Sequence, residues 1–182
     1  HDELMMPKIP PKYDIGFQVM NTDINFLREL EPWCSCIYLD GNSDAYINEY
    51  IKADKPILGI CVGFQVLFQK STEGKLKGLG IFKGEFKSLK NFIKIIPNVG
   101  WKKVKGNFNM KKFFSYKKQK YFYFSHSYYL TSYNKKDIAG FIKLKNKMIP
   151  AVLINKNIFG FQFHPEKSAK EGIFFLKKFC ER

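Results

Sequence analysis

The sequence predicts an α/β protein, with a mostly parallel central sheet flanked by helices and an added antiparallel β layer. The first observation is that residues 36–60 alternate as strand, helix and strand, which is typical of a parallel unit. The second is a series of short apolar segments between residues 81 and 163, separated by turn residues, which favours antiparallel pairing. The third is an amphipathic stretch at residues 168–180, which predicts a closing helix.

The N-terminal third supplies the predicted parallel unit. Turn chemistry at Asp40–Ser43 and the pair Lys55-Pro56 delimit its central helix. In chain order we expect a helix at Asn21–Leu30, a strand at Cys36–Leu39, a helix at Ser43–Ala53 and a strand at Ile57–Ile60, followed by a further helix that runs to Ser71.

The remaining chain is expected to form the added β layer and the closing helix. Ile173, Phe174, Leu176 and Phe179 recur at helical spacing and are expected to face the core. The expected strands are Ile81–Leu89, Phe92–Ile96, Trp101–Lys105, Tyr121–Ser125, Ile138–Lys143, Ala151–Asn155 and Ile158–Phe163.

Length and composition favour one globular domain over residues 1–182. The hydrophobic fraction is 45% and the aromatic fraction 17%, which fits a packed core. No apolar run reaches the roughly 18 residues of a membrane span, and no secretory signal is visible at the start. The four cysteines lack metal-site or disulfide-scaffold spacing, so we expect free thiols, no metal, no cofactor and a cytoplasmic location.

The net charge of +15 is concentrated in one segment. Between Lys83 and Lys120 there are twelve lysines and one acid, Glu85, so this segment alone contributes 12 − 1 = +11. Three interpretations are open: a solvated face, a nucleic-acid site, or a docking face for an acidic partner. The segment contains no arginine and no nucleic-acid motif, so we favour the solvated face and expect no nucleic-acid partner.

Cys61 lies between two glycines where the strand Ile57–Ile60 is expected to turn into a helix. A nucleophile at such a turn is lifted clear of the sheet, and small residues such as Gly59 and Gly63 permit the close backbone approach. The backbone N–H of Val62 would then face a developing oxyanion. A buried structural cysteine is the alternative for this stretch taken alone.

A second stretch, 158-IFGFQFHPEKS-168, supplies a base and an acid. His164 follows an apolar strand, and Glu166 lies two residues later with Pro165 between them. A thiol nucleophile needs a base, and the base needs a group that orients it. The spacing lets both side chains leave the strand end on the same side, so the sequence predicts a Cys-His-Glu constellation.

These motifs resemble the class I glutamine amidotransferases. The stretches G-I-C-V-G-F-Q and F-Q-F-H-P-E-K-S carry the resemblance. Three others, 75-KLKGLGIFKGE-85, 96-IPNVGWKKV-104 and 122-FYFSHSYYL-130, resemble the glutaminase subunit of imidazole glycerol phosphate synthase in histidine biosynthesis. The resemblance covers roughly residues 44–179 and implies the amidotransferase fold.

The resemblance also implies a reaction and a partner. Cys61 would attack the side-chain amide of L-glutamine, His164 would move the proton, and Glu166 would orient His164. The ammonia would pass to a (β/α)₈-barrel cyclase in a heterodimer, which makes imidazole glycerol phosphate and AICAR. By their positions in the motifs, Gln65, Ser127 and Tyr128 would bind glutamine, Val62 and Gly41 would supply oxyanion donors, and Trp101 would face the partner. The resemblance assigns His126 no catalytic role, and we expect it to be structural.

The N-terminal 40 or so residues depart from the family pattern. They lack a D-Y-G-x-G-N turn and a P-G-V-G oxyanion turn, and the nearest counterpart is Asp40–Ser43, which contains Gly41. Lys102 and Gln69 also differ from the residues usual at those positions. Two alternatives therefore stay open: a paralogue that supplies ammonia for amidino-sugar or surface-glycan synthesis, and a scaffold that has lost glutaminase activity.

Overall fold

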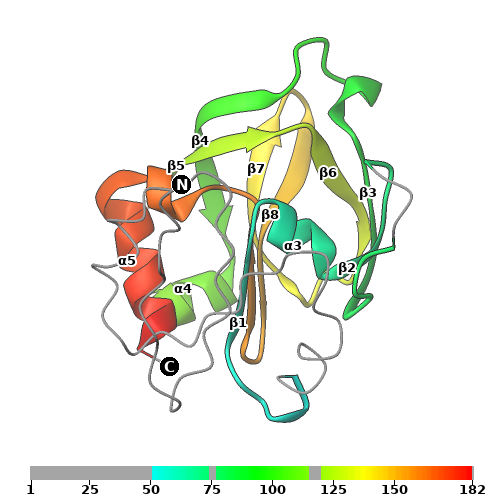
Figure 1. Cartoon of the computed structure of the whole chain (residues 1–182). Helices are drawn as coiled ribbons and strands as arrows, with labels where there is room; N and C mark the ends of the chain where they lie inside the picture. Colours follow the sequence, from blue (N-terminus) through cyan, green and yellow to red (C-terminus); the bar gives the residue numbers. More distant parts are fainter. Residues whose placement is uncertain (1–50, 74–76, 115–119, 182) are drawn as a thin grey trace, which may run out of the picture.

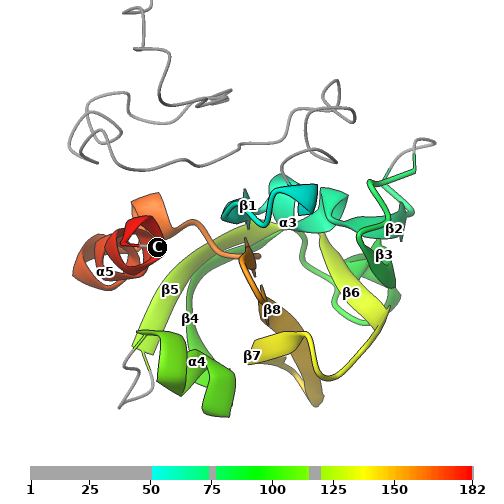
Figure 2. The same ribbon diagram turned by 90° about the horizontal axis from the view of Figure 1, so that it is seen from below.

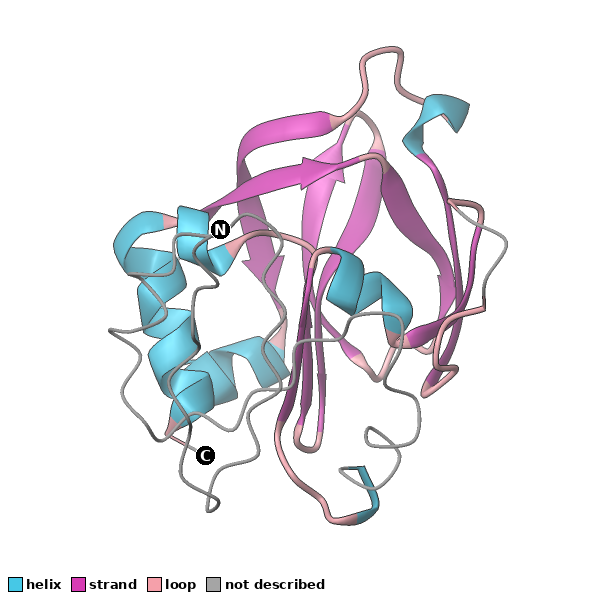
Figure 3. Cartoon of the chain, viewed as in Figure 1, coloured by secondary structure: helices cyan, strands magenta, loops and turns pink. Residues whose placement is uncertain are grey.

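The computed structural model describes residues 51–73, 77–114 and 120–181. The helix predicted at Asn21–Leu30, the strand predicted at Cys36–Leu39 and the position of Gly41 lie outside the described residues, as does most of the helix predicted at Ser43–Ala53. The described strands form two sheets, flanked by helices (Figures 1 and 3). The strands are β1 (Ile57–Ile60), β2 (Phe68–Ser71), β3 (Phe82–Ser88), β4 (Asn98–Gly106), β5 (Lys120–His126), β6 (Tyr128–Tyr133), β7 (Ile138–Leu144), β8 (Lys147–Asn155) and β9 (Ile158–Phe161).

The six-stranded sheet has the order β1-β9-β8-β7-β4-β5, and the three-stranded sheet has the order β2-β3-β6. β1 pairs with β9 in parallel, whereas the other pairs of the larger sheet are antiparallel. The predicted α/β class with an added β layer is confirmed. Among the described strands, however, the larger sheet is mixed rather than mostly parallel, because hairpin connections join β7 to β8 and β8 to β9.

The helices are α3 (Val62–Val66), α4 (Phe108–Phe114) and α5 (Ala169–Cys180), with short 3₁₀ turns η1 (Leu89–Asn91) and η2 (Pro165–Lys167). α4 and α5 lie together beside the larger sheet, and α3 lies close to the second sheet (Figure 1). Seen from below, the larger sheet is strongly curled (Figure 2). This curl matters for the site, because a bridge joins Tyr123 of β5 to His164 just after β9.

Two apolar clusters hold these layers together. The larger cluster lies between the six-stranded sheet and α4 and α5, where the rings of Phe114 and Phe175 stack at 4.1 Å between centroids. The smaller one joins α3 to the second sheet, with Phe64 packed edge-on against Phe68 and Phe86. Each large buried side chain contributes roughly 1.5–3 kcal/mol relative to exposure, so these aromatic clusters are a major source of stability.

Several predicted elements need correction. The helix after Cys61 ends at Val66 rather than Ser71, because Phe68–Ser71 pair with β3 as β2. Phe92–Ile96 form no strand, since η1 and a turn occupy this connection. On α5, Phe175 is fully buried while Ile173 and Phe174 are only partly buried, so the buried face is turned from the one expected.

Candidate active site

Cys61 lies at the sharp turn between β1 and α3. Its backbone has φ 53° and ψ −102°, a conformation that residues other than glycine rarely adopt. The Cys61 N–H donates to the carbonyl oxygen of Phe161 at 2.7 Å, which fixes the turn to the end of β9. A Cβ atom at Gly59 would lie 2.6 Å from the carbonyl oxygen of Gly63, so only glycine permits this close approach. The predicted strand-to-helix turn is therefore present.

The sulfur of Cys61 faces two other elements. It lies 3.7 Å from the carbonyl oxygen of Ser125 on β5 and 3.9 Å from the amide Nε2 of Gln162. Cys61 is a free thiol and is partly exposed. Cys180, in contrast, is disulfide-bonded, so the expectation that all four cysteines are free thiols is wrong at that position.

His164 is held by its backbone directly after β9. Its N–H donates to the carbonyl oxygen of Tyr123 at 2.8 Å. Its own carbonyl accepts a 2.5 Å hydrogen bond from the hydroxyl of Ser168, which is fully buried. The same hydroxyl oxygen accepts from the Tyr123 N–H at 2.9 Å. Ser168 therefore ties the His164 turn to β5, a role that sequence analysis missed although the residue ends the H-P-E-K-S motif.

Glu166 orients the imidazole of His164. The Nδ1 atom of His164 lies 2.7 Å from Oε1 of Glu166, and the two side chains are 19% and 11% exposed. The bond to Glu166 occupies Nδ1 and leaves Nε2 for Cys61, whose side chain lies near enough to raise the pKa of His164. The structure therefore brings together the three predicted residues Cys61, His164 and Glu166.

Two opposing effects set the pKa of His164. Burial is the largest single influence and lowers it, because a charged imidazolium is poorly solvated in the protein. Hydrogen bonds to Cys61 and Glu166, together with the negative charges of both partners, outweigh burial and raise the pKa to about 9. At neutral pH the base is therefore an imidazolium, which is the partner that a nucleophilic thiolate requires.

Two glutamine side chains lie next to this constellation. Gln65 is 7% exposed and its backbone N–H donates to the carbonyl oxygen of Cys61 at 3.3 Å. Gln162 is 1% exposed and contacts the sulfur of Cys61. In both, the side-chain Oε1 is buried with no hydrogen-bond partner among the described residues. The role of Gln65 in glutamine binding stays a prediction, and Gln162 had no predicted role.

The other predicted site residues are placed as follows. Ser127 forms the bend between β5 and β6, where its carbonyl oxygen accepts from the Leu89 N–H at 2.8 Å, and Tyr128 begins β6. Val62 begins α3 and is 54% exposed, and its role as an oxyanion donor stays a prediction. Trp101 is 49% exposed on β4, with its ring edge-on to Tyr123 at 6.2 Å between centroids.

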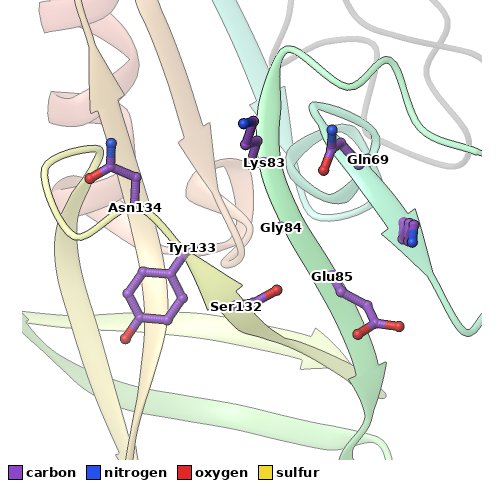
Figure 4. A pocket seen from close by; sticks show the side chains of 8 residues that line it. Gln69, Lys83, Gly84, Glu85, Ser132, Tyr133 and Asn134 are labelled. Atoms are coloured by element: carbon purple, nitrogen blue, oxygen red, sulfur yellow. The ribbon is translucent and has the colours of Figure 1, made fainter.

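A separate hollow lies on the three-stranded sheet (Figure 4). None of the predicted catalytic or glutamine-binding residues lines it. Gln69 does, so this departure from the family pattern lies at a different place from Cys61. Its lining residues are Gln69, Lys70, Lys83, Gly84, Glu85, Ser132, Tyr133 and Asn134.

Comparison with known proteins decides the family. The family model described as "Glutamine amidotransferase class-I" matches residues 40–182, which is most of the chain. The chain belongs to the class I glutamine amidotransferases. As expected for an amidotransferase, it is similar in fold to the structure of PurLQS from Thermotoga maritima, with a TM-score of 0.62 and 16% identity over 80% of this chain and 78% of that one. It is also similar in fold to a putative GMP synthase protein from Thermoplasma acidophilum, with a TM-score of 0.59 and 19% identity over 93% of this chain and 90% of that one.

Curated relatives of this amidotransferase are more similar in sequence. Each of the three relatives described next carries the name "Imidazole glycerol phosphate synthase subunit HisH". The protein from Pyrococcus furiosus is 43% identical over 73% of this chain and 68% of its own length. The one from Caldanaerobacter subterraneus is 44% identical over 74% and 66%, and the one from Prochlorococcus marinus 39% over 69% and 60%. The matches thus span about two thirds of the length of these relatives.

Within the part of this amidotransferase that the structure describes, no helix is long and apolar enough to cross a membrane.

Proposed function

We propose that this chain is the glutaminase subunit of an imidazole glycerol phosphate synthase. It hydrolyses L-glutamine to glutamate and ammonia, and the ammonia passes to a (β/α)₈-barrel cyclase that makes imidazole glycerol phosphate and AICAR in histidine biosynthesis. The observation that carries the proposal is that Cys61, His164 and Glu166 come together, with His164 bonded to Glu166 and its pKa raised by both partners. The HisH relatives at 39–44% identity support this choice of synthase among glutamine-dependent enzymes.

The first half of the reaction forms a thioester. The Cys61 thiolate attacks the carboxamide carbon of glutamine, and negative charge develops on the carboxamide oxygen. The imidazolium of His164 gives its proton to the departing nitrogen, the C–N bond breaks, and ammonia leaves. A pKa of about 9 keeps His164 protonated at neutral pH, so the acid is ready before glutamine binds.

The second half releases glutamate. The neutral imidazole of His164 now accepts a proton from water, and the resulting hydroxide attacks the thioester carbon. The C–S bond breaks and the thiolate returns next to the imidazolium. Glu166 stays ionised throughout and stabilises the charged imidazole, so its contribution is orientation and electrostatics.

The developing oxyanion needs donors, and the turn between β1 and α3 offers a candidate for one of them. The Val62 N–H follows the nucleophile and is our candidate for the first donor. Gly41 is our candidate for the second. The mechanism also needs Cys61 as a free thiol, and Cys61 is free in the structure.

The cyclase partner is expected to dock on the outer face of β4 and β5. Val99, Trp101 and Tyr121 are about half exposed on these strands. Trp101 pairs in register with Tyr123, whose carbonyl binds the backbone of His164. A partner on this face would therefore lie close to the site where ammonia is released.

The test is glutamate release from L-glutamine by this chain, measured alone and then in the presence of the barrel cyclase with its nucleotide ligand. The proposal expects release that depends on the partner, and loss of release in Cys61→Ala with complex formation retained. No release from a complex that has formed would instead indicate a scaffold without glutaminase activity. Release supported only by an amidino-sugar synthase partner would indicate the paralogous pathway.

A further inference from the structure

Two buried polar side chains lie side by side at the end of the β4–β5 ladder. Asn98 and His126 are paired in register and are 6% and 4% exposed. The Nδ2 atom of Asn98 lies 2.9 Å from Nε2 of His126, and Nδ1 of His126 lies 2.7 Å from the carbonyl oxygen of Tyr128. Polar groups at this depth are costly unless they are paired, so both hydrogen bonds hold the site in one arrangement.

The two hydrogen-bond partners of His126 determine which ring nitrogen carries its proton. A carbonyl oxygen only accepts, so Nδ1 of His126 must carry the hydrogen that it gives to Tyr128. An amide nitrogen only donates, so Nε2 must be the unprotonated acceptor of Asn98. His126 is therefore neutral, with its proton on Nδ1. Burial acts in the same direction: together with the nearby charges of His164 and Lys102 it outweighs the hydrogen bond to Tyr128 and lowers the pKa of His126 to about 4.

The backbone that this pair holds borders the nucleophile. Ser125, one residue before His126, places its carbonyl oxygen 3.7 Å from the sulfur of Cys61. Ser127, one residue after, is held from the other side by the Leu89 N–H. The segment from Ser125 to Tyr128 is thus fixed by His126 where it passes the reactive sulfur.

We propose that Asn98 and His126 form a positioning pair for the glutamine pocket. His126 holds the Ser127–Tyr128 backbone through the Tyr128 carbonyl, and Asn98 ties this backbone to the strand that carries Trp101. The pair touches no substrate in this role and acts through the backbone it holds. The inference rests on the proposed function and adds a link between the docking strand β4 and the glutamine pocket.

The test compares His126→Phe, which removes both hydrogen bonds, with His126→Asn. An asparagine amide can occupy the place of Nδ1 and donate to Tyr128, so it is the conservative rescue. Both variants are assayed in the complete complex with the barrel cyclase. We expect KM for glutamine to rise roughly tenfold in His126→Phe, with a smaller change in kcat, because the hydrogen bond that holds the Tyr128 carbonyl is lost and one hydrogen bond corresponds to about a tenfold change. His126→Asn keeps that hydrogen bond and should recover KM. Ile142→Val, a buried change on β7, controls for lost core packing.

A second readout separates the pocket from the nucleophile. Alkylation of Cys61 by iodoacetamide does not need the glutamine pocket, whereas 6-diazo-5-oxo-norleucine does. His126→Phe should lose labelling by the glutamine analogue and keep its rate with iodoacetamide. Unchanged KM and labelling in a folded His126→Phe would overturn the positioning role alone. If the wild-type complex neither releases glutamate nor reacts with the analogue, the proposed function fails and the positioning role fails with it.

Discussion

At Cys61 the backbone is strained so that the sulfur can be exposed. Its φ of 53° with ψ of −102° costs on the order of 1–3 kcal/mol for a residue with a Cβ atom. Cys61→Gly should therefore raise the free energy of unfolding by about 1 kcal/mol while abolishing glutaminase activity. Cys61→Ser keeps the strain and should lose activity without gaining stability. Thermal unfolding and glutamate release check this, and a less stable glycine variant would contradict it.

The protonation of His164 should limit activity at high pH. The Glu166 and Cys61 partners outweigh burial and hold the pKa of His164 near 9, so the general acid is lost as the pH rises through that value. We expect kcat/KM of the complex to fall above about pH 9. Glu166→Gln removes one stabilising partner, so its decline should begin at a lower pH. A pH–rate profile from 7 to 10.5 checks both.

The same variants rank the roles of the two residues. His164→Ala removes the proton carrier and should reduce kcat/KM more than Glu166→Gln does. The opposite order would argue against the assigned roles.

The raised pKa of His164 also affects folding stability. The His164 interactions stabilise the protein fully below pH 6.5, and this contribution is lost as the pH rises through about 9.

His126 should make the protein sensitive to acid. Burial first, and the charges of His164 and Lys102 in addition, lower the pKa of His126 to about 4, against an ordinary value of 6.5. As the pH falls, His126 therefore takes up its proton at a higher pH in the unfolded chain than in the folded chain. This contribution to stability is present above pH 6.5 and is lost as the pH falls through about 4. Compared with wild type, His126→Asn should lose less stability between pH 7.5 and pH 4.5, as measured by urea unfolding.

Among the elements, the turn between β1 and α3 requires glycine at position 59 but has room for a side chain at position 63. A Cβ at Gly59 would meet backbone atoms of Gly63 and Phe64 at 2.6–2.8 Å, whereas a Cβ at Gly63 has nothing within 4 Å. Gly59→Ala should destabilise the protein by roughly 1–3 kcal/mol and disturb Cys61. Gly63→Ala is the matched control, and as a helical change it should be neutral or stabilising by up to about 1 kcal/mol. Equal losses in both would contradict this account.

The turn also shows what the sequence could predict. The apolar runs of β1 and β9 are short and bounded by turn residues, so β1 was predicted with its observed bounds, and β9 begins at Ile158 as predicted but ends at Phe161 rather than Phe163. The helix α4 was missed although Asn107 caps it, accepting from the N–H groups of Asn109 and Met110. The lysines around this short helix weaken its apolar pattern, and packing of Met110 and Phe114 on the sheet stabilises it instead.

Other parts of the site depend on contacts that no local pattern contains. Ser168 and Asn98 act through residues far away in sequence, Tyr123 and His126 respectively. The proximity of Ser125 to Cys61 depends on the curl of the sheet, which joins residues 64 positions apart. Motifs could predict the triad because each member lies in a recognisable stretch, whereas its supports are spread over β4, β5 and the residue that precedes α5.

For the whole molecule, the exposed face of β4 and β5 should set partner affinity. Trp101→Ala should weaken binding to the barrel cyclase by tenfold or more, because large aromatic side chains dominate such interfaces. Phe108→Ala is the control, since Phe108 is 75% exposed on α4 rather than on this face. Titration of one protein with the other by calorimetry measures both variants, and equal effects would argue for a different docking face.

The parallel pairing of β1 with β9 has a consequence for synthesis on the ribosome. Ile57 pairs with Ile158 and Ile60 with Phe161, so about a hundred residues separate the partners. The Cys61 turn is fastened to Phe161, and both the acid and the base follow that residue in the chain. A nascent chain that ends before β9 can contain the cysteine without its imidazolium. The thiol therefore lacks its base until β9 and the residues directly after it have been synthesised and have paired with β1.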